Sequence, residues 1–346
     1  MFYIDDDLDA LVLDASGVHP KARCQIDFQR TLRIPDDNQE YPLPPGLGSF
    51  PLHHVDDYQD EFSESWKKHG GIFFPMWQAE ALWLNFHTQR GYPFAIKIAA
   101  GKINAVSGDP WSSKLVAGDS RSKRQDYVVT PNQKWLDGYC VGEGVIRQFV
   151  AMPLGSGYTA EEQRTGEAVH GGIQIIAYPM KAERYEEHML RVARAAQLVE
   201  DLSYTTVREC DAIVCCAQIG LAPGGLMRQE VFEDEYGIDA WDQGHPSRCF
   251  VHILNSREYQ EITGEAPPDE PLSAKAYTDA GFPWFDHYSE SNTALEGAKS
   301  LAGLDSVAAK GIKKGQKPLP ENVPITPGKI VSLGDKLRKM VREGAF

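Results

Sequence analysis

Alternating hydrophobic and polar positions mark several short strands in the first half of the chain. In the stretch CQIDFQRTLRI, Cys24, Ile26 and Phe28 alternate with polar residues, which is the period-two pattern of a half-buried strand. Similar short runs follow at 93–98, 102–106, 144–152 and 171–178. The pattern predicts a β-rich, antiparallel domain over residues 1–179.

One long segment departs from this pattern and has helical spacing instead. Residues 180–202 contain neither Gly nor Pro, and Tyr185, Met189 and Val192 recur on one face of a helix. Beyond this segment, short strands and short helices follow one another up to residue 305. We therefore expect an α+β protein, in which a long helix connects the antiparallel domain to a mixed α/β region at 180–305.

Three segments rich in proline or glycine are expected to interrupt the strands. Pro75 suits the first turn of a helix, in which Trp77 and Leu84 would share a buried face. Residues 220–225, GLAPGG, predict a turn between two strands. Residues 41–52, YPLPPGLGSFPL, contain too much Pro and Gly for a helix, so we expect them to lie extended over the core.

The connection at 153–170 is the most distinctive local feature of the chain. Its eighteen residues far exceed the length of an ordinary hairpin loop, which is about two to five residues. Thr159 and Glu162 have the T-x-x-E spacing of a capping box, so a helix should begin just after a Gly-Ser-Gly turn. Because free N–H groups at a helix N-terminus attract negative charge, this loop predicts an anion-binding site.

The predicted ligand of this loop is a small anion that carries a phosphate or a carboxylate. Its expected contacts are Gly155, Ser156, Gly157, Thr159 and Arg147. An enzyme could use the same loop, because Arg147 on a strand can clamp an anion while Glu162 and His170 exchange protons. Cys140 and His170 form a further candidate pair for nucleophilic catalysis, provided that their side chains come into hydrogen-bond contact.

Common catalytic and cofactor motifs are absent from the sequence. It contains no P-loop, no strand–GxGxxG–helix unit, no G-x-S-x-G elbow and no H-E-x-x-H pair. The six cysteines have no C-x-x-C spacing and suit buried positions in a reducing compartment. We therefore expect neither a cofactor nor a metal site.

The charge of the chain is negative overall but unevenly distributed. The formal net charge is −14, which disfavours nucleic acid as a partner. Residues 310–346 nevertheless contain nine Lys or Arg against three acidic residues. We expect residues 306–346 to form a basic, partly extended tail. This tail would dock on the acidic body of its own molecule or on another copy, which would produce a homo-oligomer.

The composition favours a soluble protein of the cytoplasm. No window contains the roughly 18 apolar residues of a membrane span, and the acidic N-terminus does not resemble a signal peptide. We therefore expect a cytoplasmic location and no membrane partner. Because no catalytic motif is present, we favour a binding or assembly protein. The alternative is a hydrolase or transferase that acts on an anionic small molecule at residues 153–170.

Overall fold

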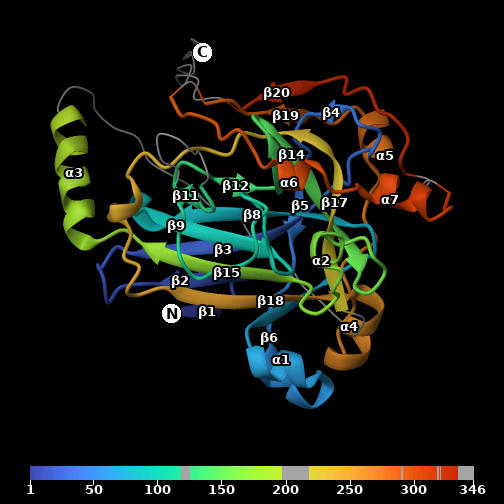
Figure 1. Ribbon diagram of the computed structural model, residues 1–346, viewed down its shortest axis with the longest axis horizontal. Helices are drawn as coiled ribbons and strands as arrows, with labels where there is room; N and C mark the ends of the chain where they lie inside the picture. The colour runs from blue at the N-terminus through green and yellow to red at the C-terminus, as the bar shows by residue number, and fades with distance from the viewer. Residues whose placement is uncertain (118–124, 197–217, 290, 318, 320, 334–346) are drawn as a thin grey trace, which may run out of the picture.

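The computed structural model describes residues 1–117, 125–196, 218–289, 291–317, 319 and 321–333 (Figure 1). The strands are β1 (Phe2–Asp5), β2 (Ala10–Asp14), β3 (Arg23–Thr31), β4 (Glu40–Tyr41), β5 (Gly46–Ser49), β6 (His53–His54), β7 (Ile72–Met76), β8 (Ala81–Thr88), β9 (Phe94–Ala100), β10 (Ile103–Asn104), β11 (Val128–Thr130), β12 (Trp135–Leu136), β13 (Gly138–Gly142), β14 (Val145–Pro153), β15 (Ile173–Pro179), β17 (Gln218–Arg228), β18 (Ser247–Asn255), β19 (Trp284–Asp286) and β20 (Ile330–Ser332). The α-helices are α1 (Glu64–His69), α2 (Ala160–Thr165), α3 (Ala182–Ala196), α4 (Ser256–Thr263), α5 (Ala274–Asp279), α6 (Lys299–Ala302) and α7 (Val307–Lys313). Short 3-10 helices are η1 (Val55–Glu61), η2 (Gln89–Gly91) and η3 (Ile238–Ala240).

A single large sheet organises the described part of the chain. It contains seventeen of the described strands, and its central path runs β3–β8–β14–β17–β18–β15–β9. Neighbouring strands are antiparallel except where β4 joins β17 and β7 joins β18. The α+β class and the β-rich, antiparallel character expected from the sequence broadly fit this arrangement.

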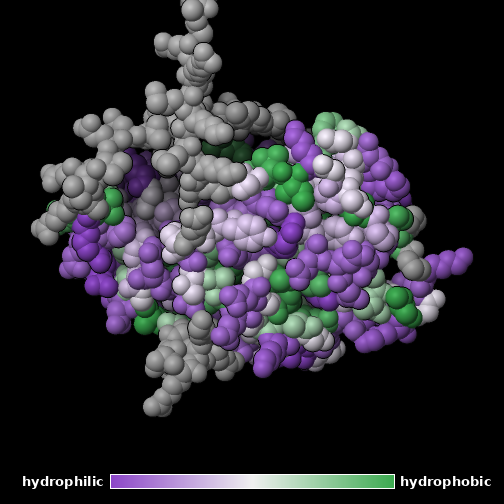
Figure 2. All heavy atoms as spheres, turned by 90° about the horizontal axis from the view of Figure 1, so that it is seen from above, coloured by the Kyte–Doolittle hydropathy of each residue, from purple (hydrophilic) through white to green (hydrophobic). Residues whose placement is uncertain are grey.

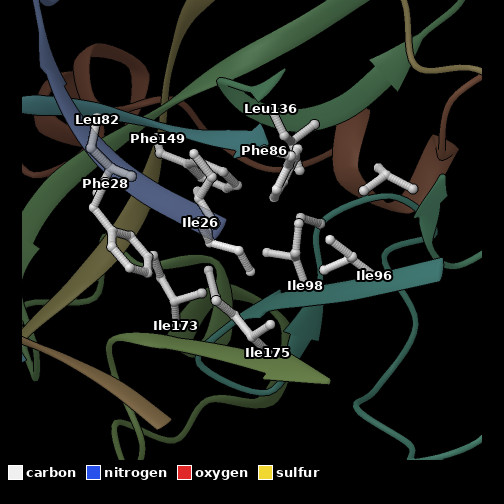
Figure 3. Close-up of a cluster of buried hydrophobic side chains, with 14 of the residues drawn as sticks. Ile26, Phe28, Leu82, Phe86, Ile96, Ile98, Leu136, Phe149, Ile173 and Ile175 are labelled. Carbon is white, nitrogen blue, oxygen red and sulfur yellow. The ribbon is translucent and has the colours of Figure 1, made fainter. Parts of the chain in front are cut away.

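The hydrophobic core lies where the sheet folds back on itself. Side chains of β3 and β8 meet side chains of β9 and β15 there (Figure 3). Ile26 and Phe28 of β3 are fully buried, as the alternation in the sequence predicts. Burial of such side chains contributes roughly 1.5–3 kcal/mol each, so this core is the main source of stability.

Strands from both sides of Pro179 pair with each other. β14 pairs with β17 from Val145 opposite Arg228 to Pro153 opposite Ile219. β15 pairs with β18 and β9. The two strands that flank the 153–170 connection therefore have different neighbours. The long helix expected after Pro179 is confirmed as α3, which stands at one side of the sheet in Figure 1.

The helix expected at Pro75 is wrong, because Pro75 lies inside β7. All five residues of β7 are buried, and β8 begins after a turn in which the N–H of Glu80 donates to the carbonyl of Trp77 at 3.0 Å. β6 pairs with Ile72 and Phe73 only, so Pro75 lies beyond that pairing. The missing N–H of Pro75 therefore costs no hydrogen bond to β6, and on the other edge of β7 Pro75 lies opposite Leu254 of β18.

The turn expected at GLAPGG is also wrong, because these residues belong to the continuous strand β17. A Cβ atom at Gly225 would lie 2.3 Å from the carbonyl oxygen of Pro35, and one at Gly224 would lie 2.5 Å from the side chain of Val150. The register with β14 also shifts here, between Arg147 and Phe149. These glycines therefore serve a bulge and close strand packing rather than a reversal of the chain.

Buried glutamines fix an extended segment against the sheet. Gln125, Gln133 and Gln229 are each about 3–5% exposed. Gln133 donates from Nε2 to the carbonyl of Trp135 at 2.8 Å and accepts from the N–H of Phe232 at 3.1 Å. Each amide group thus replaces a missing backbone partner, which satisfies polar groups that would otherwise be buried unpaired.

The described part of the basic tail packs on the body of its own chain. The N–H of Ala308, in the first turn of α7, donates to the carboxylate of Asp36 at 2.7 Å. Asn322 donates from Nδ2 to the carbonyl of Asp36 at 2.9 Å, and Arg33 pairs with Glu321 at 3.1 Å. Further on, β20 pairs in parallel with β19. A homo-oligomer formed through this tail stays a prediction.

Candidate functional site

The 153–170 connection contains the helix that its capping box predicts. Thr159 is the N-cap of α2, and its Oγ1 accepts from the N–H of Glu162 at 3.2 Å. The helix ends at Gly166, which has the left-handed φ of 76° that favours glycine. Gly155 and Gly157 also have positive φ, of 86° and 74°. The turn and the helix start that the sequence predicts are therefore present.

The N–H groups of this turn are already bonded to a carboxylate from the same loop. Glu162 accepts from the N–H of Gly157 at 2.7 Å through Oε1 and from the N–H of Thr159 at 3.0 Å through Oε2. The hydroxyl of Thr159 donates to the same Oε2 at 2.7 Å. Ser156 donates its hydroxyl to the carbonyl of Pro153, and its own carbonyl accepts from Lys314. An external anion would have to displace Glu162.

A second glutamate closes the far end of the connection. The side chain of Glu161 lies under Gly101, and its Oε2 accepts from the N–H groups of His170 and Gly171, both at 3.2 Å. Burial raises the pKa of Glu161, although these two hydrogen bonds act in the opposite direction. The ring of His170 lies 6.0 Å from that of His69, and burial lowers the pKa of His170.

The two remaining sequence candidates have structural contacts. Arg147 on β14 donates from Nη1 to the carbonyl of Gly224 at 3.0 Å and lies 3.8 Å from the carboxylate of Asp36. Cys140 on β13 is only 1% exposed, and burial raises its pKa to about 12. A thiol with this pKa stays protonated near neutral pH, which removes the nucleophilic thiolate. Arg147, Glu162 and His170 thus each contact different groups.

Replacing Glu162 by Ala tests whether the loop binds an anion. We expect a loss of about 1 kcal/mol in the free energy of unfolding, because the capping box is broken. Phosphate should then stabilise the variant more than it stabilises the parent protein, because two backbone N–H groups are released. Thermal unfolding in phosphate and in chloride at matched ionic strength measures both effects, with Glu167→Ala as the control in the same loop. Equal phosphate stabilisation of variant and parent would contradict an anion site at these amides.

A second candidate site is an aromatic hollow, which we call the tryptophan pocket. Its volume is about 370 Å³, within the range of small-molecule sites. It is lined by Leu43, Pro44, Pro45, Gly46, Trp83, Trp135, Asp137, Phe285 and Leu333. A hollow beside α3 is larger, at about 430 Å³, but its lining includes the exposed side chains of Arg184 and Arg191. The tryptophan pocket therefore has the more apolar lining.

Neighbouring strands and the proline-rich segment build this pocket. Trp83 lies on β8 and Trp135 on the adjacent β12, with ring centroids 6.3 Å apart and planes at 73°. Leu43 and Phe285 exchange two backbone hydrogen bonds, at 2.7 and 2.9 Å, and so tie the proline-rich segment to β19. Gly46 lets the segment pack closely on the indole, because a Cβ atom there would lie 3.2 Å from Cζ2 of Trp83. The expectation that residues 41–52 lie extended over the core agrees with these contacts.

Two polar groups stand out in the apolar lining. Asp137 is 3% exposed, and its carboxyl accepts from Nε2 of Gln229 at 2.7 Å and from the side chain of Trp135. Burial raises the pKa of Asp137 to about 8, although both hydrogen bonds act to lower it. The indole Nε1 of Trp83 is buried and has no hydrogen-bond partner among the described residues. An unpaired buried donor of this kind costs about 1–3 kcal/mol.

Sequence reasoning missed the tryptophan pocket. Its rings are separated by fifty or more residues along the chain, so no local motif joins them. The one local signal was the proline-rich segment, whose hydrophobic residues required a covering surface. The polar residue of the pocket could not be recognised either, because the sequence WLDG does not indicate that its Asp is buried.

Comparisons with protein-family models, with curated proteins and with solved structures found no match to this chain. In the part of the chain that the structure describes, no helix is long and apolar enough to cross a membrane. The same described residues contain no group of three or more His, Cys, Asp or Glu side chains placed to hold a metal ion. The site must therefore be interpreted from its own chemistry.

Proposed function

We propose that this protein binds a small organic molecule in the tryptophan pocket. The observation that carries the proposal is one concave site whose lining combines the aromatic residues Trp83, Trp135 and Phe285 with the buried Asp137. Ligand sites in proteins combine apolar walls with a few polar groups that orient the ligand. The face that carries β19 and β20 otherwise mixes hydrophilic side chains with separate hydrophobic patches (Figure 2).

Binding is better supported than catalysis. Glu162 and Arg147 are engaged in contacts that hold the fold together, and burial keeps the thiol of Cys140 protonated. A hydrolase or transferase acting at residues 153–170 would need these groups to be released first. An anion at the same loop would have to compete with the carboxylate of Glu162. We therefore rank the tryptophan pocket above the loop as the ligand site.

Removal of an indole from the pocket tests the proposal. A screen of small cyclic and aliphatic compounds against the full-length protein, read by tryptophan fluorescence and thermal shift, should identify ligands. Trp135→Ala should weaken their binding about tenfold or more, because the ligand loses an apolar wall. Trp111→Ala is the matched control, since Trp111 lies outside the pocket lining. Ligands whose affinity falls equally in both variants would place the site elsewhere, and a screen without ligands would contradict the proposal.

A further inference from the structure

Among the described residues, the lining of the tryptophan pocket contains one acidic residue and no basic residue. Asp137 is the only ionisable residue among the described residues that line it, and that lining contains no Lys or Arg. Several charged or titratable groups lie on the surrounding elements. Arg228 pairs with Asp286 at 3.0 Å, and Glu230 accepts from the N–H of Ser289. The ring of His287 packs on Trp135, and Lys134 and Lys329 are exposed. The basic groups near the pocket thus lie outside its lining.

The buried carboxyl of Asp137 lacks a countercharge among the described residues that line the pocket. Its two hydrogen-bond partners, Gln229 and the side chain of Trp135, are donors that favour a carboxylate. Burial without a cation opposes that charge. A positively charged ligand would remove the opposition, because it would supply the missing countercharge inside the pocket.

The aromatic walls suit the same kind of ligand. The indoles of Trp83 and Trp135 are nearly perpendicular, and Phe285 adds a third ring to the lining. An organic cation is attracted to the faces of such rings, most strongly to indole, and the attraction grows when water is excluded. A neutral apolar molecule would gain only the burial of its surface. An anion would find no countercharge among the described residues of this lining, which contains no Lys or Arg.

On the basis of the proposed binding function, we infer that the tryptophan pocket takes an organic ammonium ion. Asp137 supplies its countercharge, and the aromatic rings of the lining contact the cationic group.

A pair of probes with the same shape tests the charge requirement. Choline and its neutral isostere 3,3-dimethyl-1-butanol differ only in having nitrogen or carbon at the quaternary centre. Titration of the full-length protein, followed by calorimetry and tryptophan fluorescence, should show choline binding about tenfold more tightly. Choline affinity should also rise with pH up to about 8 and then level off, as Asp137 ionises. Equal affinity for the two probes would overturn the inference and leave the binding function intact.

One variant assigns the role of the acidic group. Asp137→Asn should abolish the preference for choline while the neutral alcohol still binds. If Asp137→Asn keeps the preference, the countercharge lies elsewhere and the inference is wrong. If neither probe binds while other compounds do, the ligand is not an ammonium ion. If no compound binds, the proposed function itself fails.

Discussion

Replacing Asp137 by Asn should flatten the dependence of stability on pH between about 4 and 8. The folded protein holds this carboxyl at a pKa of about 8, against 3.8 for an ordinary Asp. As the pH rises above 4, the carboxyl ionises in the unfolded chain but stays protonated in the fold. The unfolded state is therefore favoured progressively, by up to ~1.4 kcal/mol per pH unit.

The sign of this effect distinguishes Asp137 from a salt-bridged carboxylate. Because the pKa is raised, Asp137 costs the fold no stability below about pH 4. The free energy of unfolding then falls as the pH rises, and the full loss is reached by about pH 8. Over this range the loss amounts to roughly 4–6 kcal/mol, which is a large share of the total stability of a domain. Asn cannot ionise in either state, so the variant carries no such slope.

Urea unfolding of parent and variant at half-unit steps from pH 4 to pH 9 measures the effect. Subtracting the two curves cancels the contributions of other buried carboxyls, such as Glu80 and Asp126, whose pKa values burial also raises. The same substitution at the exposed Asp60 is the control. A difference curve that stays flat across this range would show that Asp137 is ionised in the fold at neutral pH.

Local signals explain what the sequence predicted correctly. The capping box of α2 depends on two residues three positions apart, and the long helix on spacing within one segment. The same capping box also argues against an external anion at this loop. In a capping box the glutamate reaches back to the N-terminal amides, so Glu162 is the anion that the loop was expected to recruit.

Contacts between distant segments explain the errors. Pro75 and the glycines of β17 were interpreted by their usual local roles, as a helix start and a turn. Their true roles depend on neighbours far away in sequence. A Cβ atom at Gly225 would meet the carbonyl oxygen of Pro35, and Pro75 lies on a strand that pairs with β18. The tryptophan pocket could not be predicted from the sequence for the same reason. No spacing in the chain indicates that Trp83 and Phe285 line one hollow.

A buried ion pair beneath the 107–117 segment should be costly to break from either side. Lys97 on β9 is 1% exposed, and its Nζ lies 2.5 Å from Oδ2 of Asp126, which is 5% exposed. The same ammonium donates to Oγ of Ser112 at 3.0 Å and to the carbonyl of Lys114 at 2.6 Å. All three donors of the ammonium therefore have partners, and they join the loop to the sheet.

Breaking this pair from either side should cost about 3–5 kcal/mol in the free energy of unfolding. Asp126→Asn leaves a buried ammonium without its countercharge, and Lys97→Met leaves a buried carboxylate. The double variant should lose much less than the sum, because no unpaired charge remains. We expect a coupling free energy of about 2 kcal/mol or more from a double-mutant cycle measured by urea unfolding.

The exposed pair Lys275–Asp279 on α5 is the matched control for this cycle. Its charges lie 2.6 Å apart, nearly as close as the buried pair, but their side chains are 53% and 62% exposed. Solvent screening should reduce its coupling to about 0.5 kcal/mol or less. Hydrogen exchange gives an independent measure, because the amide of Val116 is bonded to Oδ1 of Asp126 and should lose protection when Lys97 is replaced. Similar coupling energies in the two cycles would mean that burial does not set the strength of the Lys97–Asp126 pair.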